Sequence, residues 1–232
     1  MLQQSTGYSL IRSKERKRTI SLRIMPDGRI IIRAPYRTAH KEIESFFQSK
    51  RDWVRKKLLE KEERARKDGS GPTKFVSGEK FLYLGEWYPL DIQSKDGRKT
   101  PLMLSWSRFI LDEERAGEAR ALFIKWYREE AKRLFADRVD HYSRKFSLFA
   151  KDIKVTSAEC RYGSCSPVNS LSFTWRLVMA PLAAIDYVII HELVHTKVKN
   201  HSKRFWESVA SAMPDYKVHR NWLRKNSHLL RV

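Results

Sequence analysis

Cysteine is scarce in this chain of 232 residues, which contains only Cys160 and Cys165. Two cysteines exclude an extended disulfide framework and a zinc site built from several thiolates. No run approaches the ~20 apolar residues of a membrane span, and the N-terminus lacks the charged start and apolar core of a signal peptide. We therefore expect free thiols, a cytoplasmic location and no membrane partner.

Acidic residues are also few, since 27 Asp and Glu stand against 47 Lys and Arg, a formal charge of +20. Such a charge attracts anions, so nucleic acid and nucleotides become candidate partners. A basic surface that only faces solvent explains the charge alone equally well. Hydrophobic residues make up 41% and aromatic residues 12%, which predicts a folded globular chain and not a disordered one.

The N-terminal part combines strand and helix patterns. Residues 8–34 alternate apolar and polar side chains and predict strands, with a hairpin turn at Pro26-Asp27-Gly28. One or two amphipathic helices follow and fade into the charged run Glu60 to Lys67. The glycine-rich segment near 68–73 predicts a flexible linker.

Short apolar segments between residues 75 and 112, separated by polar turns, predict a small antiparallel sheet. We therefore expect an α+β fold whose first region, residues 1–112, is basic and contains antiparallel strands and helices. This basic half is the candidate contact for nucleic acid.

The second region, residues 113–232, is predicted to be a separate domain. A long helix from about Ala116 to Phe149 carries apolar residues at helical spacing. The segments predicted after it are a strand over Asp152–Ser157, a loop over Arg161–Pro167, a strand over Ser170–Val178, a helix from Pro181 to about Asn200, and closing helices over Ser202–Met213 and Pro214–Leu230.

The helix after Pro181 carries the strongest chemical signal of the chain, His191-Glu192-Leu193-Val194-His195. Side chains four residues apart lie on one face of a helix, so two imidazoles can bind one metal ion. Zinc fits best, because it accepts neutral imidazole and keeps an open position for water. Glu192 stands beside this face as the general base of an HExxH site.

A catalytic zinc site needs a third protein ligand, and His201 is the preferred candidate. Asn200 offers a helix end at which the chain can turn back toward the metal. The metzincin pattern has the same spacing but requires glycine where this chain has Val198, so we do not assign the chain to that group. Glu207 and Asp215 are the fallback ligands.

The C-terminal part resembles the YgjP-like family of zinc metallopeptidases over roughly residues 155 to 224. The matching segments are Arg161–Ser166, Trp175–Leu177, Ala180–Leu182, Ile185–Val188, His191–His195, Asn200–Ser202, Phe205–Trp206 and Met213–Tyr216. Tyr162 departs from the tryptophan usual in the family, and Phe173-Thr174 from leucine and asparagine. Both departures lie outside the metal motif.

The resemblance implies a zincin-like domain, with the metal motif on a helix packed against a small sheet. It implies one catalytic zinc ion held by His191, His195 and His201, with Glu192 as the base. Activated water would attack a carbonyl carbon or a phosphorus. Among nearby donors, Arg161 and Tyr216 are ranked first for the developing negative charge, ahead of Tyr162, His219 and Arg220.

Peptide hydrolysis is the first functional hypothesis, and the strand around Ser170 to Arg176 would offer an edge for an extended peptide. The alternative enzyme is a hydrolase of phosphoric anhydrides such as nucleoside triphosphates, which the basic surface would attract. No glycine-rich Walker loop is present, which counts against nucleotides. A nucleic-acid-associated binding module is the alternative of another class, and the sequence does not determine the oligomeric state.

Overall fold

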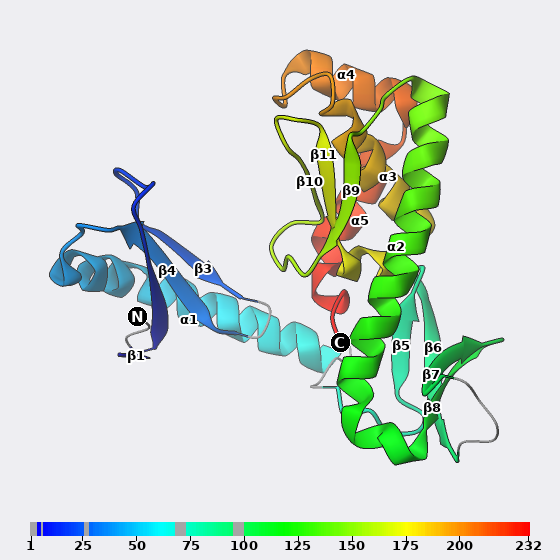
Figure 1. Cartoon of the computed structure of the whole chain (residues 1–232). Coiled ribbons are helices and arrows are strands. Elements are labelled where there is room, and N and C mark those ends of the chain that lie inside the picture. Colours follow the sequence, from blue (N-terminus) through cyan, green and yellow to red (C-terminus); the bar gives the residue numbers. More distant parts are fainter. Residues whose placement is uncertain (1–3, 6, 26–27, 68–72, 95–99) are drawn as a thin grey trace. The chain divides into compact units, whose positions relative to one another are not determined.

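The chain forms two compact units, residues 1–72 and residues 73–232. The computed structural model describes residues 4–5, 7–25, 28–67, 73–94 and 100–232 (Figure 1). Within these ranges it contains five α-helices and three small sheets, so the expected α+β class is confirmed. None of the helices described is both long and apolar enough to cross a bilayer.

The first unit is a four-stranded sheet with one helix. Its elements are β1 (Gln4–Ser5), β2 (Tyr8–Ser13), β3 (Ser21–Ile24), β4 (Ile30–Pro35) and α1 (His40–Lys67), with strand order β1-β2-β4-β3. Ile32 and Ala34 on β4 are fully buried and share a core with Ile43 and Phe47 of α1. This unit therefore has a small core of its own.

Two expectations for the first unit need correction. β3 and β4 pair antiparallel, as a hairpin requires, but β4 also pairs with β2 in parallel. Ile32 is aligned with Leu10 on one side and Leu22 on the other, so the central position of β4 joins three apolar side chains in one row. The charged run Glu60 to Lys67 continues α1 as helix. Pro26, Asp27 and the predicted linker over residues 68–72 lie outside the described residues.

The second unit begins with a sheet in the order β5-β6-β8-β7. The strands are β5 (Lys80–Tyr83), β6 (Glu86–Gln93), β7 (Leu102–Ser105) and β8 (Arg108–Asp112). The prediction of an antiparallel sheet is wrong for one pair, because β6 and β8 run parallel. Phe109 and Leu111 on β8 are fully buried, which explains why this strand is central and the less buried β7 lies at the edge.

This sheet packs with the C-terminal elements, so the two units part between residues 72 and 73 and not at residue 112. The turn between β5 and β6 donates two backbone hydrogen bonds to the segment before the motif helix, Leu84 N–H to Val178 O and Gly85 N–H to Met179 O, both 3.0 Å. The hydroxyl of Tyr127 donates to the carbonyl of Leu82 at 2.8 Å.

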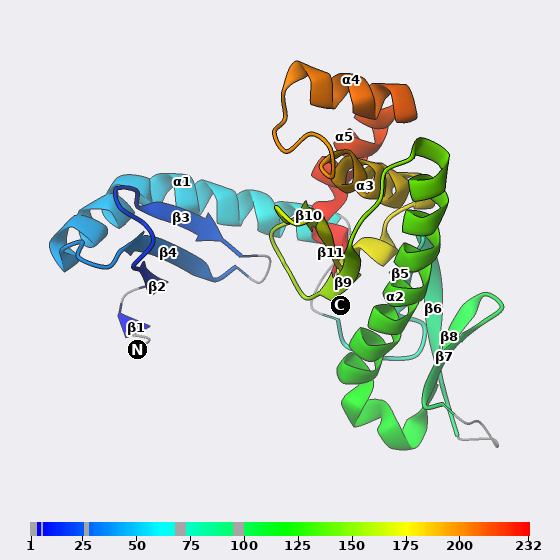
Figure 2. The same ribbon diagram turned by 45° about the horizontal axis from the view of Figure 1, so that its top comes forward.

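The remaining elements surround the motif helix. They are η1 (Glu113–Glu118), α2 (Ala119–Phe146), β9 (Asp152–Thr156), β10 (Gly163–Cys165), β11 (Ser170–Thr174), η2 (Trp175–Met179), α3 (Leu182–Val194), α4 (Lys203–Ala212), α5 (Tyr216–Asn226) and η3 (Ser227–Leu229). α3 contacts α2, α4, α5 and β10, and the turned view shows it among these elements (Figure 2). The predicted long helix and the two closing helices are present.

Two local predictions beside α3 are wrong. The expected loop over residues 161–167 contains the short strand β10, which pairs antiparallel with β11. The expected strand over residues 170–178 ends at Thr174 and continues as the 3-10 helix η2. Trp175, Leu177, Val178 and Met179 are all buried, and a strand would turn alternate side chains of such a run to the other face.

Candidate metal centre and adjoining cavity

The motif lies at the C-terminal end of α3. The helix ends at Val194, and His195 is its C-cap. The helix is therefore shorter than expected, since the sequence predicts an end near Asn200. Thr196 N–H donates to Leu193 O and Val198 N–H to Val194 O, both at 2.9 Å, which turns the chain directly after the motif. Because the chain turns here, the segment after Val198 runs back toward the C-terminal end of α3.

Three imidazoles meet at this turn. The ligand atoms of His191, His195 and His201 all lie within 4.8 Å of one another. His201 Nε2 is 3.1 Å from His191 Nε2 and 3.2 Å from His195 Nε2. The three Nε2 atoms therefore converge on one point, with two rings from the end of α3 and the third from the segment before α4.

The geometry and the protonation of the rings fit a zinc ion. Tetrahedral zinc with Zn–N bonds of about 2.0–2.1 Å sets its ligand nitrogens about 3.3 Å apart, close to the two distances between Nε2 atoms. His195 Nδ1 lies 2.9 Å from Val198 O, and this contact suits an Nδ1–H donor with its lone pair on Nε2. Clustered nitrogen lone pairs repel unless a cation lies between them.

Burial favours the neutral form of His191 and His195. It lowers the pKa of His191 to about 3, with the neighbouring His195 and His201 acting in the same direction. Burial also lowers the pKa of His195. Neutral imidazole is the form that binds a metal, so both rings on α3 are ready ligands at neutral pH.

Phe205 forms the apolar base of the cluster. This residue of α4 is fully buried, and its ring centroid lies 4.4 Å from that of His195 and 4.8 Å from those of His191 and His201. One aromatic side chain thus contacts all three imidazoles and restricts their rotation.

Glu192 lies in a tight buried position between α3 and β10. It is 6% exposed, and burial raises its pKa to about 7, although the charge of Arg161 acts in the opposite direction. A Cβ atom placed on Gly163 would lie 2.6 Å from Glu192 Cγ and 2.7 Å from its Oε1. The carboxylate therefore occupies the space that a larger residue of β10 would fill.

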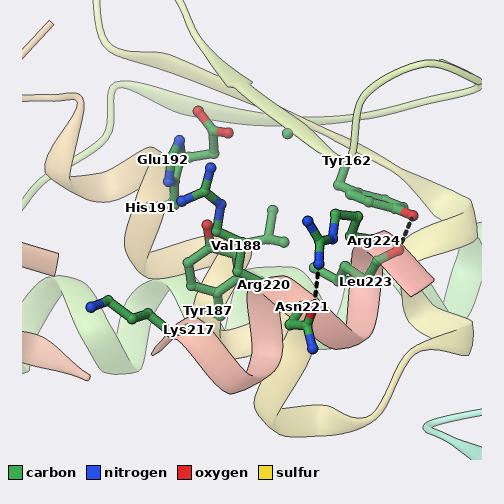
Figure 3. A pocket seen from close by; sticks show the side chains of 11 residues that line it. Tyr162, Tyr187, Val188, His191, Glu192, Lys217, Arg220, Asn221, Leu223 and Arg224 are labelled. Atoms are coloured by element: carbon green, nitrogen blue, oxygen red, sulfur yellow. Dashed lines mark hydrogen bonds between the residues drawn. The ribbon is translucent and has the colours of Figure 1, made fainter. Parts of the chain in front are cut away.

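A cavity of about 600 Å³ adjoins this carboxylate (Figure 3). Glu192 and His191 lie together at one end, and the guanidinium of Arg220 lies beside them (Figure 3). The lining residues are Tyr162, Gly163, Tyr187, Val188, His191, Glu192, Lys217, Arg220, Asn221, Leu223 and Arg224. The wall opposite α3 therefore comes from α5, whose lining side chains are mostly basic.

The two donors ranked first from the sequence do not line this cavity. Arg161 is exposed and acts on Glu192 only through its charge. Tyr216 is buried, with its ring 5.5 Å from Trp206 and 6.2 Å from Tyr187. Of the lower-ranked candidates, Tyr162 and Arg220 line the cavity, and Arg220 is the one whose guanidinium lies beside His191 (Figure 3).

The fallback ligands are engaged elsewhere. Glu207 forms an exposed ion pair with Lys203 at 3.7 Å. Asp215 accepts from His219 Nε2 at 3.0 Å, one turn further along α5. The structure thus brings His201, and neither carboxylate, into the histidine cluster.

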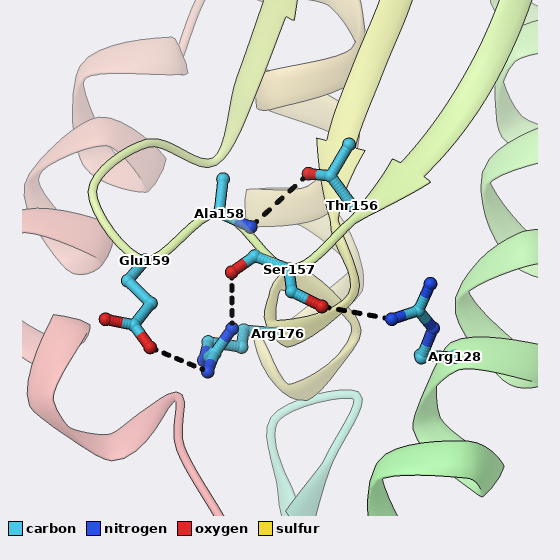
Figure 4. A network of polar contacts seen from close by, with 6 residues as sticks. All are labelled: Arg128, Thr156, Ser157, Ala158, Glu159 and Arg176. Carbon is cyan, nitrogen blue, oxygen red and sulfur yellow. Dashed lines mark hydrogen bonds and ion pairs between the residues drawn. The ribbon is translucent and has the colours of Figure 1, made fainter. Parts of the chain in front are cut away.

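A polar network holds the segment that leads into β10 (Figure 4). Arg128 of α2 donates to Ser157 Oγ at 3.0 Å, and Arg176 of η2 donates to Ser157 O at 3.1 Å. Arg176 also pairs with Glu159 at 3.5 Å. These contacts attach the chain before Gly163 to two helical elements and so support the side of the cavity formed by β10.

The peptide edge expected at residues 170–176 is misplaced. β11 is the central strand of its sheet, paired with both β9 and β10. The edge strand on the cavity side is β10, for which the described residues supply no second strand partner. Because Thr174 N–H bonds to Tyr162 O, the alternation of an antiparallel pair turns the backbone groups of Gly163 and Cys165 away from β11.

Sequence reasoning missed Gly163, Lys217, Asn221 and Arg224 as site residues. Lys217 and Arg224 could have been found from the sequence, because they lie seven residues apart and two helical turns place them on one face of a helix. Gly163 had no such signal, since only the packing of α3 against β10 shows that a side chain there would meet Glu192.

Three converging imidazoles, a buried carboxylate and an adjoining cavity define a candidate catalytic metal centre. The model of the YgjP-like metallopeptidase domain matches residues 18–226, so the chain belongs to the YgjP-like family. This match continues across the boundary between the two compact units. No curated protein and no solved structure matches the chain.

Proposed function

We propose that the protein is a zinc-dependent peptidase in which Glu192 is the general base. One observation carries this proposal: three imidazole Nε2 atoms converge beside a buried carboxylate at the end of a cavity. The family supplies the reaction class, a metallopeptidase. The three histidines would hold the ion through Nε2, and bound zinc supplies a Lewis acid that lowers the pKa of water toward ~7.

Glu192 performs the proton transfers in this proposal. Its carboxylate accepts a proton from the attacking water and later donates that proton to the leaving amine. A pKa of about 7, raised by burial, suits a group that must accept and release a proton near neutral pH. Gly163 keeps the carboxylate in place by allowing β10 to pack closely against it.

Arg220 is the donor that we assign to the negative charge developing on the substrate. Its guanidinium lies beside His191 in the cavity (Figure 3) and 4.8 Å from the ring centroid of Trp206. A cation over an aromatic face has a restricted direction. Arg220 is therefore set in position before the substrate arrives, as electrostatic stabilisation of an oxyanion requires.

An extended peptide has a binding edge beside Glu192. The outward backbone groups of Gly163 and Cys165 can add a strand to β10, with the scissile carbonyl facing the base. The alternative, hydrolysis of a phosphoric anhydride, is favoured by the basic wall of α5 alone. The edge strand favours the peptide.

The test uses two variants of the purified protein with measured zinc content. Glu192→Gln is expected to retain zinc and to lose peptidase activity by about 100-fold or more, because it removes the base and leaves the ligands. His201→Ala is expected to lower zinc affinity by more than the roughly 10–100-fold typical of outer-shell changes. Full activity of Glu192→Gln, or unchanged zinc affinity of His201→Ala, would contradict the assigned roles.

A further inference from the structure

The cavity wall formed by α5 carries a row of cations. Lys217, Arg220 and Arg224 all line the cavity, together with the amide of Asn221. Their spacing of three and four residues places them on one face of the helix, over about 10 Å from first to last at 1.5 Å per residue. Glu192 is the single acidic residue in this lining.

Both arginines are oriented by neighbours and not by acids. Arg224 donates to Asn221 Oδ1 at 2.8 Å, and Arg220 lies over Trp206. Among the residues that the structure describes, no carboxylate pairs with Arg220, Arg224 or Lys217. The two arginines are therefore preset, and within the described part of the chain none of the three cations is neutralised by an ion pair before a molecule enters the cavity.

We propose that Lys217 and Arg224, the two ends of this row, form a subsite for carboxylates of the peptide substrate, so that acidic residues next to the scissile bond are preferred, while Arg220 between them keeps its role at the scissile carbonyl. The inference rests on the proposed peptidase function and adds its substrate class. The carboxylate belongs either to an Asp or Glu side chain or to the C-terminus of a peptide, since both present the same group to an arginine.

The spacing of the cations favours a polypeptide over a nucleotide. Polyphosphate sites usually gather cations and backbone amides around one point, whereas these cations are spread along two turns of a helix. Tyr187, Val188 and Leu223 also line the cavity and offer apolar contact to the stem of a side chain. An extended acidic peptide can satisfy both features.

The first measurement compares internally quenched peptides that differ only in the residues flanking the cleaved bond, as Glu, Ala or Lys, each with a free and an amidated C-terminus. For the zinc-loaded full chain, kcat/KM for the Glu peptide is expected to exceed that for the Lys peptide by about tenfold or more. A fall in kcat/KM on amidation that is the same for all three flanking residues assigns the carboxylate to the C-terminus. Equal rates for Glu, Ala and Lys peptides that amidation leaves unchanged overturn the subsite.

The second measurement is charge reversal with a matched control. Arg224→Glu and Lys217→Glu are each expected to lower the ratio of Glu-peptide to Lys-peptide kcat/KM by about tenfold. Lys225→Glu makes the same charge change at an exposed position of α5 that does not line the cavity, and it should leave the ratio and the zinc content unchanged. An equal drop of this ratio in Lys225→Glu would mean that the overall charge of the protein, and not the cations lining the cavity, sets the preference, and it would overturn the subsite.

Binding separates this inference from the proposed function. The Glu192→Gln protein should bind the Glu peptide more tightly than the Lys peptide, with an affinity that weakens as salt rises. If the wild type cleaves no peptide, the peptidase proposal fails, while the binding series still tests the row of cations. Displacement of the Glu peptide by a nucleoside triphosphate at lower concentrations than by free Glu peptide would overturn the carboxylate assignment in favour of phosphate.

Discussion

The two helices that border the cavity differ in almost every physical respect. Ten of the 13 residues of α3 are buried, including its acidic residues Asp186 and Glu192. Only Tyr216 and Leu223 are buried among the 11 residues of α5, and the rest of that helix is largely basic and accessible. α3 is held on several sides, whereas α5 is held along one apolar stripe.

This difference separates two requirements of a hydrolase. The groups assigned to metal binding and proton transfer need fixed positions and shifted pKa values, and burial provides both. The groups assigned to substrate selection need exposed charge, which a half-exposed helix provides without loss of stability. A substitution on α3 should therefore affect folding or turnover, and one on the exposed face of α5 should affect specificity.

The largest expected effect concerns the ion pair that attaches α3 to α2. Arg138 donates to both carboxylate oxygens of Asp186 at 2.7 Å, and its side chain is 24% exposed against 9% for Asp186. Arg138→Ala leaves a nearly buried carboxylate without this partner and should lower the free energy of unfolding by about 3 kcal/mol. Denaturant unfolding of the zinc-loaded protein measures it.

Arg144→Ala is the matched control on the same helix. Arg144 pairs with Asp140 at 3.0 Å, but the two side chains are 76% and 58% exposed, so its loss should cost less than about 0.5 kcal/mol. Equal losses of unfolding free energy in the two variants would mean that general packing, and not the buried ion pair, holds α3 in position.

Sequence patterns predict the chemistry of α3 better than its surroundings. The spacing of His191 and His195 on a helix and an apolar run before them locate the motif, because helical periodicity is a local property. His201 meets them through a turn directly after Val194, earlier than the turn expected at Asn200. The third histidine of the cluster is thus the expected residue, although the chain turns back at an earlier position than expected.

Longer-range pairings are less accessible to sequence reasoning. Gly163, Ser164 and Cys165 have little strand propensity, so β10 looks like a loop until its pairing with β11 is seen. The parallel pair β6 and β8 likewise depends on which strand is most buried. The basic residues of α5 look like a solvated face, because the sequence does not show which side of a helix borders a cavity.

A second, smaller effect concerns the boundary between α3 and β10. Gly163→Ala places a Cβ within 3 Å of Glu192 Cγ, and overpacking of this kind costs about 1–3 kcal/mol. Because Glu192 is buried, we expect it to shift, and a displacement near 1 Å can lower kcat by roughly 100-fold. Gly117→Ala is the control, since a Cβ there meets nothing within 4 Å.

Activity and stability measured together decide the outcome for Gly163. We expect Gly163→Ala to retain zinc and to lose turnover, because Glu192 moves while the histidines stay in place. A variant with normal kcat would show that the carboxylate has room to adjust and that burial does not fix its position. Loss of zinc would place the damage in the ligands instead.

The smallest expected effect tests the attachment of α5. Tyr162, which precedes β10, donates to Leu223 O at 3.3 Å (Figure 3), and burial raises the pKa of Tyr162 to about 12. Removal of this hydrogen bond in Tyr162→Phe should cost about 1 kcal/mol near neutral pH.

The pH dependence of that cost has a defined sign. An unfolded tyrosine ionises near pH 10, so between about pH 10 and about pH 12 the unfolded state releases a proton that the folded state retains, and stability falls as pH rises. By about pH 10.5 the wild type should lose at most about 1 kcal/mol from this group, and Tyr162→Phe should lose none of it. The stability difference should therefore shrink between about pH 8 and about pH 10.5 in denaturant titrations. A constant difference would mean that the Tyr162 hydroxyl ionises as in the unfolded chain, and that α5 is attached by its apolar stripe alone.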